Sequence, residues 1–214
     1  FAGLWQPTSK VTELKPVDGK LPALKPQAQK LYDAIRASTA RGDRWWDIEL
    51  DCLPLGLTRL MAESPFELVV GGKQVALAFE WNRHVHIAGR RAKHEAEYDY
   101  PAYLGHTIAN LRGNALELDS TYFSDETALD STGLPVSEKL HVVQSFTLRD
   151  ADTMVDTVSI TDPDVFAAPW KTVLTYKRMP AGTQMKEDVC VDRMKVTHLN
   201  AHARREEGLK KLGL

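Results

Sequence analysis

Hydrophobic and polar residues alternate with a period of two over most of the chain between residues 66 and 179. Phe66–Val70 ends at Gly71-Gly72, and the alternation resumes over Gln74–Trp81, which predicts a tight β-hairpin. The same alternation predicts further strands over Arg83–Ala88, His106–Leu111, Ala115–Phe123, Lys139–Arg149, Thr153–Thr161 and Lys171–Met179. The pattern therefore predicts a meander of about eight antiparallel strands joined by short turns.

The two ends of the chain have different patterns. Residues 1–25 hold three prolines with polar residues between them, which predicts an extended arm. Apolar residues recur at helical spacing from Pro26 to about Ala40, and Gly42 follows as a stop signal. Residues 201–214 are predicted as an amphipathic helical tail. We therefore expect an arm over 1–25, a single β-barrel domain with its leading helix over 26–200, and the tail.

A meander of this length is typical of a mainly β protein. Closing the meander into a single antiparallel barrel removes its exposed edges and leaves an interior able to hold one small ligand. An open sandwich is the alternative. The barrel is the fold we predict.

Charge and hydropathy limit the classes of molecule that this protein is expected to bind. Lys and Arg total 27 against 29 Asp and Glu, so the net charge of −2 gives no electrostatic footprint for nucleic acid. No apolar run is long enough to predict a membrane span. The expected partner is a small hydrophobic or aromatic molecule, and the oligomeric state stays open, with a homodimer as one option.

The chain has two cysteines, Cys52 and Cys190, and neither lies in a redox or metal motif. A disulfide between them would close a loop worth about 5 kcal/mol in the chain-entropy model. Such a bond persists outside the reducing cytosol. The chain begins at Phe1, which a removed signal peptide would explain, so a periplasmic or secreted protein is expected. Two buried free thiols in a cytosolic protein are the alternative.

Several stretches over roughly residues 50–190 carry a family resemblance in the right order. They are Cys52-Leu-Pro-Leu-Gly56, Pro65-Phe-Glu67, Gly89-Arg90, Gly105-His106, Gly113-Asn114-Ala-Leu116, Asp119-Ser-Thr-Tyr-Phe123, Ser137–Phe146, Thr161-Asp162-Pro163, Pro169-Trp170 and Glu187-Asp-Val-Cys190. These stretches are similar to those of a family of uncharacterised exported bacterial proteins with a lipocalin-like (calycin-like) β-barrel. The resemblance implies that fold and export.

Strand alternation over Val75–Ala88 predicts one face that carries Glu80, Asn82, His84 and His86. Imidazole and carboxylate groups on a common face can transfer protons, and two histidines two residues apart can also present themselves to one metal ion. The alternative is a plain solvent face of a half-buried strand.

Other candidates lie on later predicted strands. Strict alternation turns His141 outward, yet it lies in a segment that matches the family, three residues after Glu138. The catalytic candidates are His84, His86, His141, Glu80 and Glu138. The candidates for substrate binding are Arg90, as an anchor for an anionic group, and Tyr122, Trp170, Tyr176 and Arg178, as an aromatic wall with a cation. Asp119 and His106 are weaker candidates.

The chain has no nucleophile elbow, dinucleotide fingerprint, P-loop or zincin motif. The leading hypothesis is therefore an exported barrel enzyme, of the lyase or isomerase type, that performs acid–base chemistry without a cofactor or resident metal. A carrier that leaves its ligand unchanged is one alternative. A metal-dependent protein that uses His84 and His86 is the other.

Overall fold

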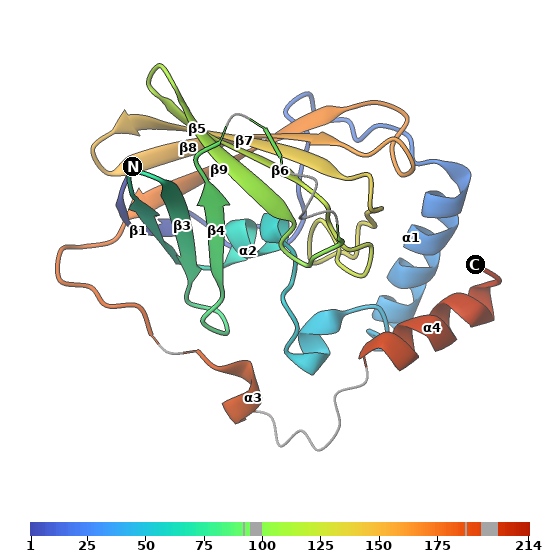
Figure 1. The fold of residues 1–214 in the computed structure, drawn as a ribbon. Helices are drawn as coiled ribbons and strands as arrows, with labels where there is room; N and C mark the ends of the chain where they lie inside the picture. The colour runs from blue at the N-terminus through green and yellow to red at the C-terminus, as the bar shows by residue number, and fades with distance from the viewer. Residues whose placement is uncertain (92, 95–99, 187, 194–200) are drawn as a thin grey trace.

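Nine strands close into a barrel in the computed structural model, which describes residues 1–91, 93–94, 100–186, 188–193 and 201–214 (Figure 1). Each strand pairs with the next, and the last pairs with the first, so the barrel prediction is confirmed and the open sandwich is excluded. The strands are β1 (Gly3–Pro7), β2 (Phe66–Val70), β3 (Gln74–Phe79), β4 (Val85–Gly89), β5 (His106–Arg112), β6 (Ala115–Thr121), β7 (His141–Asp150), β8 (Thr153–Thr161) and β9 (Trp170–Arg178).

The predicted arm contains the strand that closes the barrel. β1 pairs with β2 on one side and with β9 on the other, and Trp5 is completely buried. The expectation of an extended arm without a packed element was therefore wrong over Gly3–Pro7. Five residues are too few to show a strand period, and the pairing partners lie more than sixty and more than a hundred and sixty residues away.

One pair of neighbouring strands is parallel. β4 pairs with β5 at Ala88–Thr107 and Gly89–Ile108 in parallel, while the other eight neighbouring pairs are antiparallel. The prediction of a purely antiparallel barrel was wrong here. A parallel pair needs a crossover connection of a dozen or more residues, and residues 90–105 supply that length.

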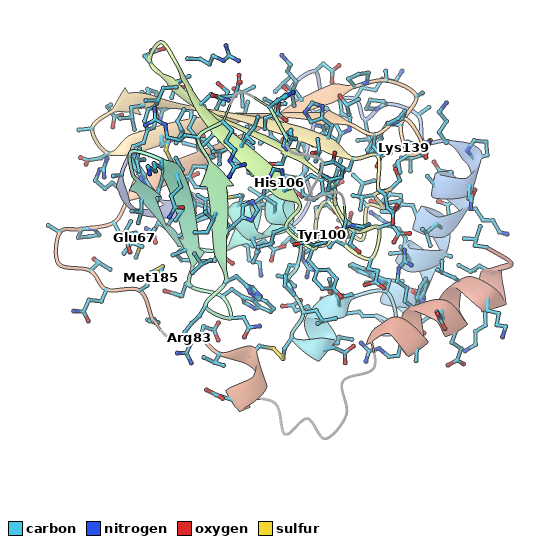
Figure 2. All side chains as sticks on the ribbon, in the orientation of Figure 1. Glu67, Arg83, Tyr100, His106, Lys139 and Met185 are labelled. Atoms are coloured by element: carbon cyan, nitrogen blue, oxygen red, sulfur yellow. A yellow bond between two sulfur atoms is a disulfide. The ribbon has the colours of Figure 1, made fainter. Side chains whose placement is uncertain are left out.

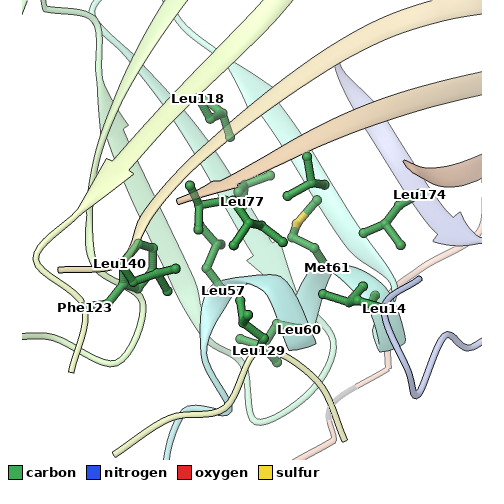
Figure 3. Packing of buried hydrophobic residues seen from close by; sticks show 14 of the residues in the cluster. Leu14, Leu57, Leu60, Met61, Leu77, Leu118, Phe123, Leu129, Leu140 and Leu174 are labelled. Carbon is green, nitrogen blue, oxygen red and sulfur yellow. The ribbon is translucent and has the colours of Figure 1, made fainter. Parts of the chain in front are cut away.

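A short helix packs into the barrel interior. Helix α2 (Leu57–Glu63) has Leu57, Leu60 and Met61 almost completely buried, and Figure 3 shows Leu57 and Met61 toward Leu77 of β3 and Leu60 beside Leu129. Arg59 of the same helix is also buried. Alternation along the strands supplies the rest of this core. Side chains of α2 therefore belong to the same buried core as the inward side chains of the strands.

The remaining helices lie outside the barrel. Helix α1 (Pro26–Ala40) has the predicted bounds, with Pro26 in its first turn, and Figure 1 places it beside α4 (Ala201–Leu212). The 3-10 helix η1 (Ile48–Asp51) and α3 (Cys190–Arg193) are one turn each. Arg204 of α4 forms an ion pair with Asp51, which holds the predicted C-terminal helix against η1.

Cys52 and Cys190 form a disulfide with a Cα–Cα distance of 5.5 Å, as predicted (Figure 2). The bond joins the end of η1 to the start of α3. Among the described residues, no helix has the length and apolar character needed to cross a membrane.

Candidate functional site

A group of side chains that we call the histidine cluster lies on the outer wall of the barrel where β5, β6 and β7 meet. Its members are His94, His106, Asp119 and His141. Successive side chains of a strand point to opposite faces, and the residues that follow Asp119 on β6 and His141 on β7 are buried. Asp119 and His141 therefore face outward. His106 begins β5, and His94 comes from the connection between β4 and β5.

One carboxylate oxygen holds two of the imidazoles. Asp119 Oδ1 lies 2.8 Å from His141 Nε2 and 3.2 Å from His94 Nε2. The other ring nitrogen of His94, Nδ1, lies 2.8 Å from His106 Nδ1. The four groups therefore form a hydrogen-bonded chain in the order His106, His94, Asp119, His141.

Tyr122 flanks this chain. Its φ of 59° lies in the left-handed region, which is uncommon for an aromatic residue, and its carbonyl accepts a hydrogen bond from Ala102 N at 2.9 Å. The distorted backbone sets the ring beside the imidazoles of His94 and His106, with centroids 6.3 and 6.4 Å away. Tyr122 thus supplies an aromatic surface next to the cluster.

Within the cluster, the pKa values of His141 and His106 are shifted in opposite directions. The hydrogen bond to Asp119 raises the pKa of His141 above its ordinary value, and the same bond lowers the pKa of Asp119. Burial lowers the pKa of His106, with further lowering by the charges of His94 and Arg91. His141 is therefore the better proton acceptor of the two.

We predict that His141 titrates at a higher pH than His106 and His86. Its raised pKa means that the Asp119 contact stabilises the fold below pH 6.5, and that this contribution is lost as the pH rises through the folded pKa. NMR titration of the imidazole signals measures the order. Asp119→Asn should return the His141 pKa toward its ordinary value, and an unchanged value in that variant would contradict the assigned cause.

The cluster is open enough to meet a substrate. The side chain of His141 is 43% exposed and that of Asp119 is 31% exposed. A carboxylate that fixes the orientation of an imidazole and raises its pKa makes that imidazole an effective acid–base group. The arrangement can therefore take a proton from, or return one to, a molecule lying against Tyr122.

No group of three or more histidine, cysteine or acidic side chains among the described residues is arranged to hold a metal ion. The cluster fits that finding, because its members follow one another in a chain instead of converging on one point.

A second set of side chains forms a layer across the barrel interior. Strands in a barrel tilt, so side chains at one height are offset by about two residues from the paired positions. Gln144 of β7 pairs with Val158, for example, yet its Nε2 donates to Asp156 Oδ2 at 2.7 Å. Following the register around the barrel, with an offset of two residues at six of the nine strand pairs and no offset at the other three, gives one inward residue per strand. We call this set the lumen layer: Trp5, Phe66, Phe79, His86, Thr107, Ser120, Gln144, Asp156 and Tyr176.

Half of the lumen layer is polar. His86 Nε2 lies 2.7 Å from Thr107 Oγ1, which lies 2.7 Å from Ser120 Oγ. Burial lowers the pKa of His86 to about 4, with a smaller contribution from His106, so this imidazole is neutral near pH 7. The three groups form one continuous hydrogen-bonded line along the inside of β4, β5 and β6.

The polar half and the hydroxyl group of the adjoining Tyr176 contain buried atoms without hydrogen-bond partners. Among the described residues, Gln144 Oε1, Asp156 Oδ1 and the Tyr176 hydroxyl find no hydrogen-bond partner. Burial raises the pKa of Asp156 to about 7 and raises that of Tyr176 well above its ordinary value. Buried polar groups without a partner are costly, so these atoms suit a water or a small polar molecule.

The other half of the layer is aromatic. The ring of Phe66 meets that of Tyr176 edge to face at 5.1 Å and lies 6.0 Å from that of Phe79. Trp5 completes this half, since it pairs with Phe66 in the register of β1 and β2. The lumen layer thus sets an aromatic wall opposite a polar one.

The predicted common face of Glu80, Asn82, His84 and His86 was wrong. Strand β3 ends at Phe79, and the left-handed φ angle of Asn82 turns the chain before β4 begins. His86 is paired with Leu77 and faces the interior, whereas His84 lies in the turn, with its ring 5.4 Å from that of Trp81. One strand therefore does not present the two histidines to a single metal ion.

The other predicted residues separate into distinct places. His141 and Tyr122 meet at the histidine cluster, and His86 and Tyr176 meet in the lumen layer, while Trp170 is buried with its ring 5.6 Å from that of Phe166. Glu80, Glu138 and Arg90 lie away from both sites, whereas Arg178 contacts Trp5 of the lumen layer. Glu80 accepts from Lys186 N, Glu138 is exposed, Arg90 donates to the carbonyls of Gly71 and Gly72, and Arg178 lies 4.1 Å over the ring of Trp5.

Five polar residues of these sites were missed from the sequence: His94, Thr107, Ser120, Gln144 and Asp156. Asp156 interrupts the inward apolar series of β8, and Gln144 interrupts that of β7, so a polar residue on a core face was the available signal. His94 had no such signal, because it lies in a connection and reaches Asp119 only through the fold. Comparison of the chain with models of known families and with curated proteins finds no match.

Proposed function

We propose that this protein is an enzyme that performs acid–base chemistry without a cofactor at the histidine cluster, on a small hydrophobic or aromatic compound. The observation that supports this proposal is the single Asp119 oxygen shared by His141 and His94. A lyase or isomerase fits best, because such reactions need only a proton taken from one atom and returned to another. The resemblance to exported lipocalin-like proteins belongs to the same proposal.

In the proposed reaction, His141 takes a proton from a carbon or oxygen of the substrate. Asp119 stabilises the imidazolium that forms and keeps the ring oriented, so Asp119 is a positioning residue. The His94 and His106 pair supplies a second proton donor on the other side of Asp119. The ring of Tyr122 lies beside this pair and would hold an aromatic or hydrophobic substrate.

Export is part of the proposal. The disulfide between Cys52 and Cys190 is compatible with an oxidising compartment, because such bonds are rare in the reducing cytosol. We therefore propose a periplasmic or secreted location. Detecting the protein in the periplasmic or culture fraction of the source cell, with both thiols oxidised, would support it.

Deuterium exchange tests the chemistry without knowledge of the product. We predict that the wild-type protein in D2O exchanges a carbon-bound hydrogen in some members of a set of small aromatic and hydrophobic carbonyl compounds. Asp119→Asn should slow this exchange by about a hundredfold, because His141 loses its charge partner. Mass spectrometry measures the incorporation.

His84→Gln is the matched control, since it removes an imidazole that lies outside the cluster, in the turn between β3 and β4. It should leave the exchange unchanged. An Asp119→Asn variant that exchanges as fast as the wild type would contradict the proposal.

A carrier is the second candidate function. It is favoured by the lumen layer, whose Gln144, Asp156 and Tyr176 have buried atoms without partners facing an aromatic wall. A carrier binds members of the same compound set, changes the tryptophan fluorescence, and never produces exchange or product. That result would replace the enzyme proposal.

A further inference from the structure

A tight turn connects β3 to β4 beside the disulfide, and we call it the β3–β4 turn. It runs from Trp81 to His84, and its two central residues, Asn82 and Arg83, have left-handed φ angles of 52° and 51° (Figure 2 labels Arg83). The backbone N–H of His84 donates to the carbonyl of Trp81 across the turn. This is the geometry of a type I′ hairpin turn, in which asparagine is favoured. The shape of the turn therefore follows from its own backbone.

The side-chain amide of Asn82 bridges the backbones of the two cysteines. Its Nδ2 donates to the carbonyl oxygen of Cys52 at 2.8 Å. Its Oδ1 accepts a hydrogen bond from the backbone N–H of Cys190 at 3.2 Å. Cys52 lies 30 residues before Asn82 in the sequence, and Cys190 lies 108 residues after it. One amide therefore binds both partners of the disulfide, through its donor and through its acceptor.

The segment that leads into α3 lies along the same turn. The backbone N–H of Asn82 donates to the carbonyl of Asp188 at 2.6 Å, and Trp81 pairs with Asp188 in a parallel bridge. One residue before Trp81, the carboxylate of Glu80 accepts from the backbone N–H of Lys186 at 3.1 Å. These contacts are made by the backbone of the later segment, and they do not require the sulfur–sulfur bond. The turn can therefore hold the start of α3 before that bond forms.

Cys52 reaches the turn from the end of η1. Its backbone is left-handed, with a φ of 59°, and its N–H donates to the carbonyl of Glu49 at 3.0 Å. A left-handed backbone is costly for a residue with a side chain and persists only where its surroundings hold it. The hydrogen bond from Asn82 to the Cys52 carbonyl is one such contact.

His84 fixes which way the Asn82 amide points. Its Nε2 lies 3.5 Å from Asn82 Nδ2, and burial lowers the pKa of His84, so the imidazole is neutral near pH 7. A neutral imidazole nitrogen accepts the second hydrogen of the amide nitrogen. The amide nitrogen therefore faces Cys52 and His84, and the amide oxygen is left to face Cys190.

We propose that the β3–β4 turn is a template that pairs Cys52 with Cys190 before they are oxidised, with Asn82 as its positioning residue. The oxidant is a small disulfide such as oxidised glutathione. One cysteine loses its proton and its thiolate attacks the reagent, which forms a mixed disulfide and releases one glutathione thiolate. The second cysteine, also deprotonated, attacks the protein sulfur of the mixed disulfide and releases the other. Two protein thiols are oxidised, and one glutathione disulfide is reduced to two thiols.

The template acts on the second step, because it holds the second thiol close to the mixed disulfide. Equilibration of the full chain with set mixtures of reduced and oxidised glutathione tests this effect. Thiol alkylation and mass spectrometry give the ratio of bonded to free cysteine pairs, and hence the effective concentration of one cysteine at the other. Asn82→Gly should lower this effective concentration by at least about tenfold, because the two hydrogen bonds that hold the pair are lost. Glycine tolerates the left-handed turn, so the change chiefly removes the amide.

Asn114→Gly is the matched control, since it makes the same substitution at an exposed position of the two-residue turn between β5 and β6. It should leave the effective concentration unchanged. A lower stability of Asn82→Gly would not by itself support the template. An amide that stabilises the oxidised and the reduced protein equally leaves the glutathione equilibrium as it is. A wild-type effective concentration in Asn82→Gly would therefore overturn the proposal.

Hydrogen exchange at position 190 tests the template without any oxidation. In the double variant Cys52→Ser and Cys190→Ser, the amide at position 190 should stay protected, because its bond to Asn82 Oδ1 does not involve sulfur. Adding Asn82→Gly to that protein should remove the protection. Equally fast exchange at position 190 with and without Asn82→Gly would overturn the proposal.

Discussion

Replacing Asp156 with asparagine should make the protein more stable above neutral pH and change its stability little below about pH 4. The carboxyl group is fully buried and burial raises its pKa to about 7, whereas the unfolded chain has the ordinary value of 3.8. Below about pH 4 the carboxyl group is protonated in both states, so its burial costs little there. As the pH rises toward 7, the unfolded state releases this proton while the folded state retains it, so the free energy of unfolding falls.

The expected effect is large. A difference of about three pKa units corresponds to about 4 kcal/mol, so Asp156→Asn should exceed the wild type by up to that amount near pH 8. Asparagine keeps the shape and an acceptor for the bond from Gln144 after an amide rotation. Urea unfolding of both proteins across this pH range measures the difference.

Asp150→Asn is the control for a general charge effect. The pKa of Asp150 is lowered, chiefly by the hydrogen bond from the backbone of Asp152, and the side chain is fully exposed. Its removal should have a small effect of the opposite sign. Parallel pH profiles for the wild type and Asp156→Asn would show that the Asp156 carboxyl does not hold its proton inside the barrel.

Loss of the disulfide should cost the protein more than any other change considered. Cys52 and Cys190 are 138 residues apart in sequence, and removing a crosslink of that span costs about 5 kcal/mol in the chain-entropy model. The double substitution Cys52→Ser and Cys190→Ser should therefore lower the urea midpoint strongly. Each single variant should give a similar loss, since either one removes the same bond.

The fold also predicts which part of the protein loses stability first when the disulfide is removed. The disulfide holds α3 against the end of η1, and the ion pair of Arg204 with Asp51 holds α4 near the same point. In the double variant, hydrogen exchange should increase first in α4, before the barrel strands. An unchanged urea midpoint and unchanged exchange would contradict a stabilising role for the bond.

Local patterns in the sequence determined most of the strands and two of the helices. The period of two located all eight later strands to within about two residues at each end, because one side of each strand faces an apolar core. The left-handed turn at Asn82 breaks the alternation between β3 and β4, so His86 faces the interior and does not share a face with Glu80 and His84. The single pair of cysteines left one intramolecular disulfide, and the structure contains it.

The sites depended on contacts between segments far apart in the chain. His141 and Tyr122 were singled out in the sequence, but their common location arises because β6 and β7 are neighbours and because His94 folds back onto Asp119. Asp156, Gln144 and Tyr176 share one height in the barrel only because the strands tilt, an offset that no local pattern records. The sequence by itself determined strands β2 to β9, helices α1 and α4 and the disulfide, since each follows from short-range periodicity or from the residue count. Tertiary structure alone decided the closing strand β1, the inserted helix α2 and the composition of both sites, because long-range pairing and strand tilt bring those residues together.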